Sequence, residues 1–422
     1  MSHVTISERV PRNLWFAGPS LLVFSALAAV LPASRLAFGA DPLGLVLAID
    51  LFLTVCFLLG YLRRPPFLWL WATGAVLVPL GAALSGTNSS VRGSLLVGAS
   101  LAAMCLLLPP VLTRLMADRP RSMAVIAGWF IAGQTVSALA GVAQFAGIHV
   151  GAGLIFGRAT GLAGHPNTLG VMAALAIVAA IALWGRATPA RRWLLGVVAL
   201  MNALVLVSTG SLSAILAAVA AVGFGVVAAR RVIGTAVSLI IILAGGFATT
   251  QLLLPGEDTL FSSIGYRLLV VTGESDGSGG AASLDIRDQT YEWAWRWIEK
   301  SPVVGVGMDP LNAGTFDGTT VVHNFLLRGW YQGGLPVVLW LTLVALVVLT
   351  LMARALRRGK GGWPVSAAFG VLVFGFTAAF LNQPTYWLPL IFAILVTAHA
   401  QRRPADLEDA RSPSESLMGH SR

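Results

Sequence analysis

The sequence predicts an all-α polytopic membrane protein. Of its 422 residues, 56% are hydrophobic and only 11% are charged, against roughly 25% charged residues in soluble domains. Apolar runs recur along the chain, and each is long enough for the ~30 Å hydrocarbon core of a bilayer. One long polar stretch, residues 255–322, interrupts them and holds ten of the 18 carboxylates. We therefore expect a single integral membrane domain over 1–403 with one large loop inserted at 255–322.

About twelve apolar runs are candidate spans. They lie near 13–33, 42–61, 66–85, 93–114, 123–147, 167–184, 193–208, 211–229, 232–254, 325–353, 364–381 and 384–400. The sequence after the last run, 404–422, is polar and rich in Ser, Asp and Glu, so we expect a disordered cytoplasmic tail there. Cys56 and Cys105 each lie inside an apolar run and are predicted to be small buried hydrophobes without a disulfide.

Basic residues alternate between successive connections, which determines the predicted orientation. Of the lysines and arginines before the tail, 18 fall on one side, and the other side carries only Arg35, Arg92, Arg158, Arg267, Arg287, Arg296, Lys300 and Arg328. The positive-inside rule then places both termini in the cytoplasm and the 255–322 loop outside. The basic residues that give the net charge of +10 follow this alternation. The charge therefore indicates topology and not nucleic-acid binding.

The large loop is predicted to contain an amphipathic helix from about 284 to 299. Asp285 and Asp288 fall in its first turn, where the helix dipole favours acids. Arg287, Tyr291 and Ile298 recur at helical spacing. The helix therefore presents an arginine and an aromatic ring from one face.

Three tryptophans, Trp293, Trp295 and Trp297, suit a helix that lies at the level of the lipid headgroups. The plainer interpretation is that these rings only anchor the loop. Ser301-Pro302 ends the helix, and the Gly305-Val306-Gly307 sequence predicts a close turn before the chain returns to the membrane.

A second outer segment runs from Arg158 to Gly170. Its His165-Pro166-Asn167 sequence leads into an apolar run, and we expect Asn167 to cap that helix. A short crossing, 208–213, lies on the same predicted side.

The tenth span opens with His323-Asn324. If residues 323–335 are helical, Asn324, Arg328 and Gln332 recur at i, i+4 and i+8 and form one polar stripe that faces the bundle interior. An arginine in a span indicates a functional site. The alternative is that Arg328 extends to the membrane interface.

Taken in order, these motifs resemble the O-antigen ligase and polysaccharide polymerase family of bacterial inner membranes. The resemblance covers roughly residues 150–340. It rests on R-x-x-G-x-x-x-H-P-N from Arg158, the S-x-S-type crossing, the arginine-led amphipathic helix followed by S-P-x-x-G-x-G, and the H-N pair at His323. The first 120 residues match only as hydrophobic helices.

The resemblance implies a multi-pass inner-membrane glycosyltransferase with a GT-C-like architecture and a periplasmic active site. Such an enzyme transfers a glycan from undecaprenyl diphosphate to a lipid A-core sugar hydroxyl during lipopolysaccharide assembly. Its partners would be this lipid-linked donor, the lipid A-core acceptor and membrane lipids, with no nucleic acid and no cofactor.

The chemistry of that reaction suggests roles for the outer-side residues. The attacking hydroxyl needs a base, and an imidazole titrates near neutral pH, so His323 is the predicted base. Guanidinium groups bind phosphate oxygens bidentately, so Arg158 and Arg287 are predicted to bind the diphosphate, with Arg328 and Arg267 in reserve. Asn324 and His165 are further candidates for substrate contact. For His323 the alternative is a purely structural hydrogen bond, and His165 competes for the base role.

The Asp285-Ile-Arg-Asp288 sequence is a possible divalent-metal pair. Both acids lie where a helix N-terminus favours them, and no third ligand is evident. We therefore expect a metal-independent enzyme. Direct attack by the acceptor without an enzyme nucleophile predicts inversion at the anomeric carbon.

Other functions remain open at this point. A polymerase of the same family would extend glycans on the lipid, but the R-x10-G spacing associated with polymerases is absent at Arg158 and Arg287. A third branch transfers glycans to protein hydroxyls, usually with additional C-terminal sequence. A secondary transporter needs several ionisable groups near the midplane, and Asp50 is the only carboxylate well inside a predicted span. A non-catalytic scaffold gives no reason for the outer arginines and His323.

Overall fold

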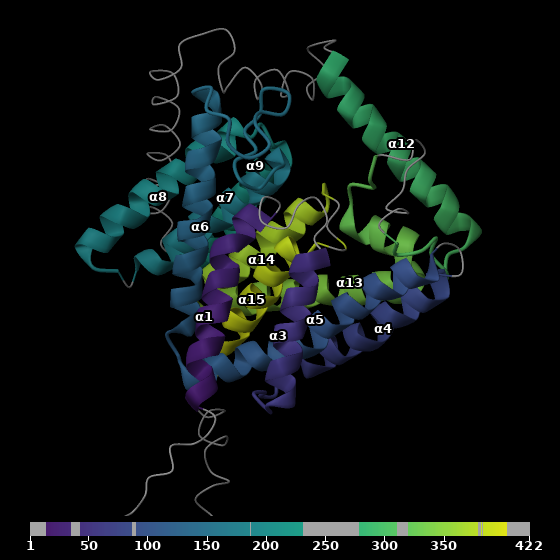
Figure 1. Ribbon diagram of the computed structural model, residues 1–422, viewed down its shortest axis with the longest axis horizontal. Helices are drawn as coiled ribbons and strands as arrows, with labels where there is room; N and C mark the ends of the chain where they lie inside the picture. The colour runs from purple at the N-terminus through teal and green to yellow at the C-terminus, as the bar shows by residue number, and fades with distance from the viewer. Residues whose placement is uncertain are drawn as a thin grey trace, which may run out of the picture.

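The protein is all-helical across the part of the chain that is described. The computed structural model describes residues 14–34, 43–86, 90–185, 187–230, 278–309, 320–378, 381 and 383–402. The only β-type pairing within these ranges is an isolated antiparallel bridge between Ile155 and Arg158. Figure 1 shows the helices packed into one bundle, with one helix lying apart from the others across one side of it.

The helices follow the apolar pattern of the sequence. They are α1 (Leu14–Val30, extended by the 3-10 turn η1, Leu31–Ala33), α3 (Leu43–Leu58), α4 (Leu68–Gly86), α5 (Val91–Asp118), α6 (Ser122–Phe145), α7 (Pro166–Trp184), α8 (Pro189–Ser208), α9 (Leu212–Ala229), α12 (Ser278–Lys300), α13 (Phe325–Arg358), α14 (Gly362–Gly375) and α15 (Pro384–Ala400).

Eleven of the twelve predicted spans correspond to helices in the described ranges. Eight are long and apolar enough to cross a membrane, whereas α3, α14 and α15 are shorter apolar helices. The predicted span at 232–254, and the tail at 404–422, lie outside the described residues. By length and composition, the helices are those of a multi-pass membrane protein.

The connections between helices gather at two ends of the bundle. At one end, the start of α7 meets the start of α15, where the Thr168 and Tyr386 hydroxyls lie 3.0 Å apart. At that same end Phe325, the first residue of α13, packs on Phe376 just after α14, with ring centroids 5.6 Å apart. We call this the loop end.

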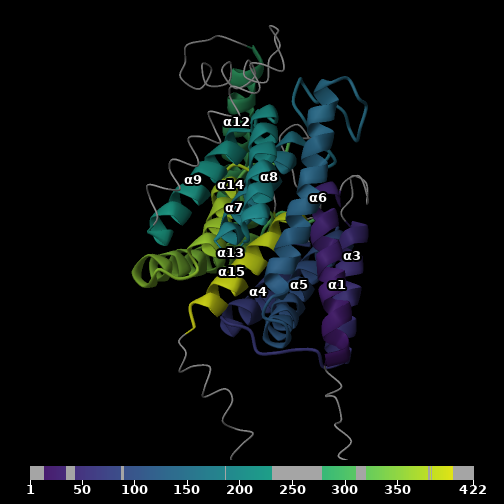
Figure 2. The same ribbon diagram turned by 90° about the vertical axis from the view of Figure 1, so that its left-hand side faces the viewer.

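At the opposite end, Arg358 of α13 donates a 3.0 Å hydrogen bond to the carbonyl of Gln401, just after α15. Figure 2 shows α12 at one end of the molecule and the last turn of α15 toward the other, which is also the end at which α1 begins. We call this the basic end, since it carries the basic connections: Arg63, Arg64, Arg114, Arg119, Arg121, Arg191, Arg192, Arg230, Arg354, Arg357, Arg358, Lys360 and Arg402. The charge alternation predicted from the sequence therefore corresponds to a spatial separation.

Aromatic stacking joins the C-terminal helices in the core. The Trp340 ring of α13 and the Trp387 ring of α15 are fully buried and stack with centroids 4.9 Å apart. Cys56 and Cys105 are both buried and free, which confirms that they act as small hydrophobes.

Several predicted boundaries need correction. The amphipathic helix begins at Ser278, earlier than the expected 284, and ends at Lys300. The predicted span 364–381 is shorter, because α14 ends at Gly375. Residue Asn324 lies outside α13 in an extended conformation, with φ −152° and ψ 120°, so it caps the helix and does not share the helical stripe.

Candidate functional site

His323 is the last residue before the cap of α13. The Asn324 side-chain oxygen accepts hydrogen bonds from the backbone N–H groups of Leu326 and Leu327, at 3.0 and 3.1 Å. A cap of this kind satisfies N–H groups that have no partner inside the helix. The cap therefore fixes the backbone on which His323 is presented at the loop end.

Helix α12 packs over this same segment. The Tyr291 hydroxyl donates a 2.8 Å hydrogen bond to the carbonyl of His323. A small apolar cluster, separate from the main core, buries Ala294 and Ile298 of α12 against Val322 and Tyr331. Burial of this one face orients α12 and carries Arg287, one helical turn before Tyr291, toward His323.

The tryptophans of α12 divide between packing and exposure. Trp293 packs on Tyr331 with centroids 5.0 Å apart, and Trp295 meets Trp330 edge-on at 5.6 Å. Trp295 and Trp297 keep 47% and 43% of their surface exposed. Their expected place at the lipid headgroups stays a prediction, but at least two of the three rings also contact neighbouring aromatic side chains.

The imidazole of His323 lies in a partly buried, positively charged environment. Burial is the main cause that lowers its pKa to about 4, and the positive charge of Arg287 lowers it further. A backbone hydrogen bond to Val321 opposes this effect, and Arg328 adds a smaller lowering. His323 is therefore neutral at neutral pH and able to accept a proton.

One nitrogen of this ring lacks a partner. The buried Nδ1 of His323 has no hydrogen-bond partner among the described residues. Leaving a buried polar atom unsatisfied costs about 1–3 kcal/mol. His323 shares this feature with other buried side chains, among them Gln134 and Asn202, so its role as a base stays a prediction.

Arg328 points into the protein, which confirms the inward prediction over the alternative of extension to the interface. Its side chain is 3% exposed, and its Nε donates a 2.8 Å hydrogen bond to Oε1 of Gln332. The amide nitrogen of Gln332 in turn donates to the carbonyls of Gly307 and Asp309, both at 3.3 Å. A buried polar network thus holds Arg328 one turn into α13, on the inner side of His323.

The segment after α12 docks on a kink in α13. Backbone hydrogen bonds run from Val306 N–H to the Tyr331 carbonyl, at 2.9 Å, and from Gly307 N–H to the Gln332 carbonyl, at 3.0 Å. Gly334 has φ +69° inside α13, where two helical pieces meet. A Cβ at Gly305 would collide with the Gln332 carbonyl. The Gly-Val-Gly sequence therefore permits a close backbone approach that holds the loop against α13.

Arg158 lies in a different part of the loop end. A tight turn with positive φ at Phe156 and Gly157 precedes it. Its Nε donates a 2.6 Å hydrogen bond to the Thr209 carbonyl, and its Nη2 donates a 2.9 Å hydrogen bond to Oδ1 of Asn167. These bonds tie the connection between α6 and α7 to the crossing between α8 and α9. The role of Arg158 in binding the diphosphate stays a prediction.

The capping residue of α7 is His165, and the expectation that Asn167 caps the helix is wrong. His165 has an extended backbone, and its Nδ1 accepts a hydrogen bond of 3.2 Å from the N–H of Asn167. Pro166 occupies the first helical position, which suits proline because that N–H would lack a partner. Asn167 is then free of the capping role and serves Arg158 instead. An imidazole nitrogen used in a cap is less suited to act as a base.

The structure thus brings three of the predicted residues together: Arg287 and Arg328 both lie close enough to His323 for their charges to lower its pKa. Asn324 supports the backbone beside them as the cap of α13. Arg158 and His165 form a second group. The two groups lie at the same end of the bundle and are connected through Thr168 and Tyr386, and through the packing of Phe325 on Phe376. Arg267 lies outside the described residues.

The sequence prediction missed the structural importance of Tyr291 and Thr209. Tyr291 follows Arg287 by four residues, so helical spacing already placed both on one face, but the hydrogen bond to His323 depends on tertiary packing. Thr209 acts through its backbone carbonyl, which no side-chain motif reveals.

No family model, curated protein or solved structure matches this chain.

Proposed function

We propose that the protein is a membrane glycosyltransferase that moves a glycan from undecaprenyl diphosphate to a lipid A-core sugar hydroxyl. One observation carries the proposal: a neutral histidine, His323, lies beside two arginines, Arg287 and Arg328, that come from separate helices. A base beside a binding site for negative charge is what this reaction requires. The resemblance of residues 150–340 to the O-antigen ligase and polymerase family supports the choice of donor and acceptor.

In the proposed step, the acceptor hydroxyl oxygen attacks the anomeric carbon of the donor sugar. The new glycosidic C–O bond forms as the bond to the diphosphate breaks, and the electron pair leaves on the phosphate oxygen. His323 takes the hydroxyl proton. The products are the glycosylated acceptor and undecaprenyl diphosphate, and a single displacement inverts the anomeric centre.

The arginines have two effects in this scheme. Arg287 stabilises the charge that grows on the leaving diphosphate, to which a guanidinium binds bidentately. In the absence of donor, the same charges disfavour a protonated His323. A bound diphosphate offsets them, so donor binding raises the pKa of His323 toward its ordinary value and strengthens the base at the moment it is needed.

Arg158 would complete the site from the other side. It is fixed by Thr209 and Asn167 at the loop end, and we propose that it contacts the second phosphate or the glycan. The order of the elements supports this, since the two groups of residues lie at the same end of the bundle and so at the same membrane face.

The direct test mixes the purified full chain with undecaprenyl diphosphate-linked glycan and a lipid A-core acceptor, without nucleotide and in the presence of a chelator. Glycan appearing on lipid A supports the ligase, whereas longer lipid-linked chains identify the polymerase of the same family. Movement of intact donor across vesicles without any new glycosidic bond would instead identify a transporter. Loss of activity on chelation would contradict metal independence.

Two histidine variants make the test specific for the base. We expect His323→Ala to abolish transfer while the protein remains folded by its unfolding temperature. The matched variant is His165→Asn, which keeps a side chain able to cap α7 and should retain most of the activity. Full activity of His323→Ala would show that another group is the base.

A further inference from the structure

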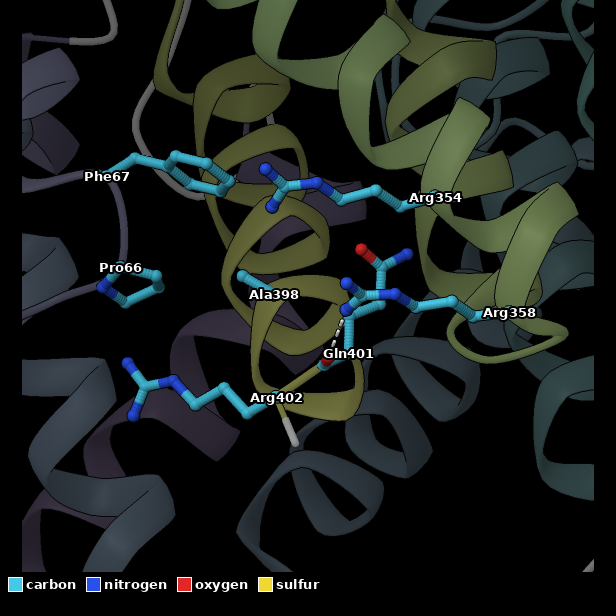
Figure 3. Close-up of a pocket in the computed structure, with 7 residues that line it drawn as sticks. All are labelled: Pro66, Phe67, Arg354, Arg358, Ala398, Gln401 and Arg402. Atoms are coloured by element: carbon cyan, nitrogen blue, oxygen red, sulfur yellow. Dashed lines mark hydrogen bonds between the residues drawn. The ribbon is translucent and has the colours of Figure 1, made fainter. Parts of the chain in front are cut away.

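A cavity lies at the basic end of the bundle. It has a volume of about 410 Å³. Its walls come from the connection that leads into α4, from the end of α13 and from the end of α15 (Figure 3). The residues that line it are Pro66, Phe67, Arg354, Arg358, Ala398, Gln401 and Arg402. Three of these seven are arginines and none carries a carboxylate, so the cavity favours an anion.

The arginines reach this space from two helices. Arg354 and Arg358 are one helical turn apart on α13, and Arg402 follows α15. Figure 3 shows the Arg354 side chain extending toward the Phe67 ring and the Arg402 side chain extending toward Pro66. Like charges that converge on one cavity repel each other, and an anion placed between them relieves that repulsion.

The wall of the cavity is built before any ligand binds. Arg358 uses one of its five N–H donors on the carbonyl of Gln401, at 3.0 Å. The Gln401 side chain is 5% exposed, and its amide nitrogen donates to the carbonyls of Leu351 and Lys360, at 3.0 and 3.3 Å. These bonds tie the ends of α13 and α15 together, so little ordering is left to be done on binding.

The neighbouring surface has the character of a membrane interface. Directly after Phe67, Leu68 and Trp69 are 40% and 51% exposed at the start of α4. Exposed tryptophan at the end of a span is typical of the headgroup region. The cavity therefore joins an apolar surface suited to acyl chains with a cluster of guanidinium groups suited to a phosphate.

We propose that this cavity binds the phosphate of an anionic phospholipid, whose acyl chains lie over Leu68 and Trp69. Guanidinium forks match phosphate oxygens bidentately, and basic pockets between spanning helices accept anionic lipid headgroups. The site is at the opposite end of the bundle from His323 and does not depend on the proposed reaction.

The experiment measures lipid binding by native mass spectrometry on the full chain in a neutral detergent. Dioleoyl phosphatidylglycerol is titrated against the zwitterionic dioleoyl phosphatidylcholine. We expect one saturable phosphatidylglycerol site, with much weaker binding of phosphatidylcholine. The double variant Arg354→Gln/Arg402→Gln should raise the dissociation constant by about tenfold or more, since each basic residue near a membrane surface contributes about 1 kcal/mol.

Arg357→Gln is the matched control. Arg357 lies in the same turn of α13 but does not line the cavity, so its loss should weaken binding much less than the double variant does. If the double variant does not fold, Arg354→Gln alone replaces it, because the Arg354 side chain is exposed and its change should not disturb folding. Loss of this one charge, worth about 1 kcal/mol, should weaken binding by about fivefold. Equal binding of the two lipids, or equal loss in Arg357→Gln, would overturn the proposal. Displacement of the lipid by inorganic phosphate at equal concentration would also overturn it, since the site would then serve a free anion.

Discussion

The hydroxyl of Tyr291 donates a 2.8 Å hydrogen bond to the backbone carbonyl of His323. Burial raises the pKa of this phenol above its ordinary value, so the hydroxyl stays protonated and remains a donor at any pH at which the protein works. This one bond joins the amphipathic helix to the residue on which the proposed chemistry depends.

Tyr291→Phe removes that bond and keeps the ring. A hydrogen bond of this type contributes about 1 kcal/mol, so we expect transfer to slow by roughly three- to tenfold and α12 to exchange its amide hydrogens faster. The rate of transfer and hydrogen exchange of α12 are the two measurements. Glu292→Gln changes the next residue, whose side chain is 73% exposed, and should leave both unchanged. A Tyr291→Phe protein indistinguishable from this control would mean that the bond does not position His323.

The positions of the helices along the chain were predicted better than the contacts between them. Apolar runs alone located eleven of the described helices, because hydrophobic length is read directly from the chain. The inward position of Arg328 was also one of two stated alternatives. Its spacing with Gln332 placed both side chains on one helical face, where the structure has a hydrogen bond between them. The assignments that failed depend on local backbone conformation, as at His165, where Pro166 takes the first helical position and the imidazole becomes the cap.

The sequence did not predict which partners the two arginines have. Arg158 and Arg287 were both predicted to bind the diphosphate, and in the structure Arg158 bonds to Thr209 and Asn167, whereas Arg287 acts on His323. That difference follows from tertiary contacts that no motif spacing encodes: Arg158 lies against the start of α7 and the crossing between α8 and α9, whereas α12 packs on the first turns of α13. The Gly305 contact with α13 is of the same kind, since it depends on a kink at Gly334.

The depressed pKa of His323 predicts a specific dependence of stability on pH. The folded protein resists protonation until about pH 4, whereas the unfolded chain takes up the proton near the ordinary value of 6.5. Between these values the unfolded state binds more protons, so stability should fall as the pH falls from about 6.5 toward 4. The unfolding temperature of the wild type should drop through this window more steeply than that of His323→Gln. Parallel curves for the two proteins would contradict the assignment.

Gly305→Ala should detach the segment after α12 from α13. The added Cβ collides with the Gln332 carbonyl, which is backbone and unable to move aside cheaply, so we expect a lower unfolding temperature and reduced transfer. Gly128→Ala is the matched change, because a Cβ there meets nothing within 4 Å inside α6. It should be neutral or stabilising by up to about 1 kcal/mol, since alanine is the better helix former. Equal behaviour of the two variants would show that the close approach at Gly305 does not matter.

Gln332→Leu tests the buried network around Arg328. The change removes the acceptor of the Arg328 hydrogen bond and the donor to the Gly307 and Asp309 carbonyls. A buried polar group left without its partner costs about 1–3 kcal/mol, and more when it is charged. We expect a clearly lower unfolding temperature in detergent, whereas Gln289→Leu on the exposed face of α12 should shift it little. An unchanged unfolding temperature in Gln332→Leu would remove this network from the account.

The most direct measurement is the single-turnover release of undecaprenyl diphosphate from the glycan donor, with Arg287→Gln compared with Arg296→Gln. Both variants remove one arginine from α12. Arg287 acts on His323, whereas Arg296 is 68% exposed and pairs with Glu292 at 3.6 Å. Removing one donor aimed at developing charge costs about 3 kcal/mol, so Arg287→Gln should slow release by about a hundredfold or more, with Arg296→Gln near the wild-type rate. Equal rates in the two variants would contradict the claim that the group of Arg287, His323 and Arg328 carries out the transfer.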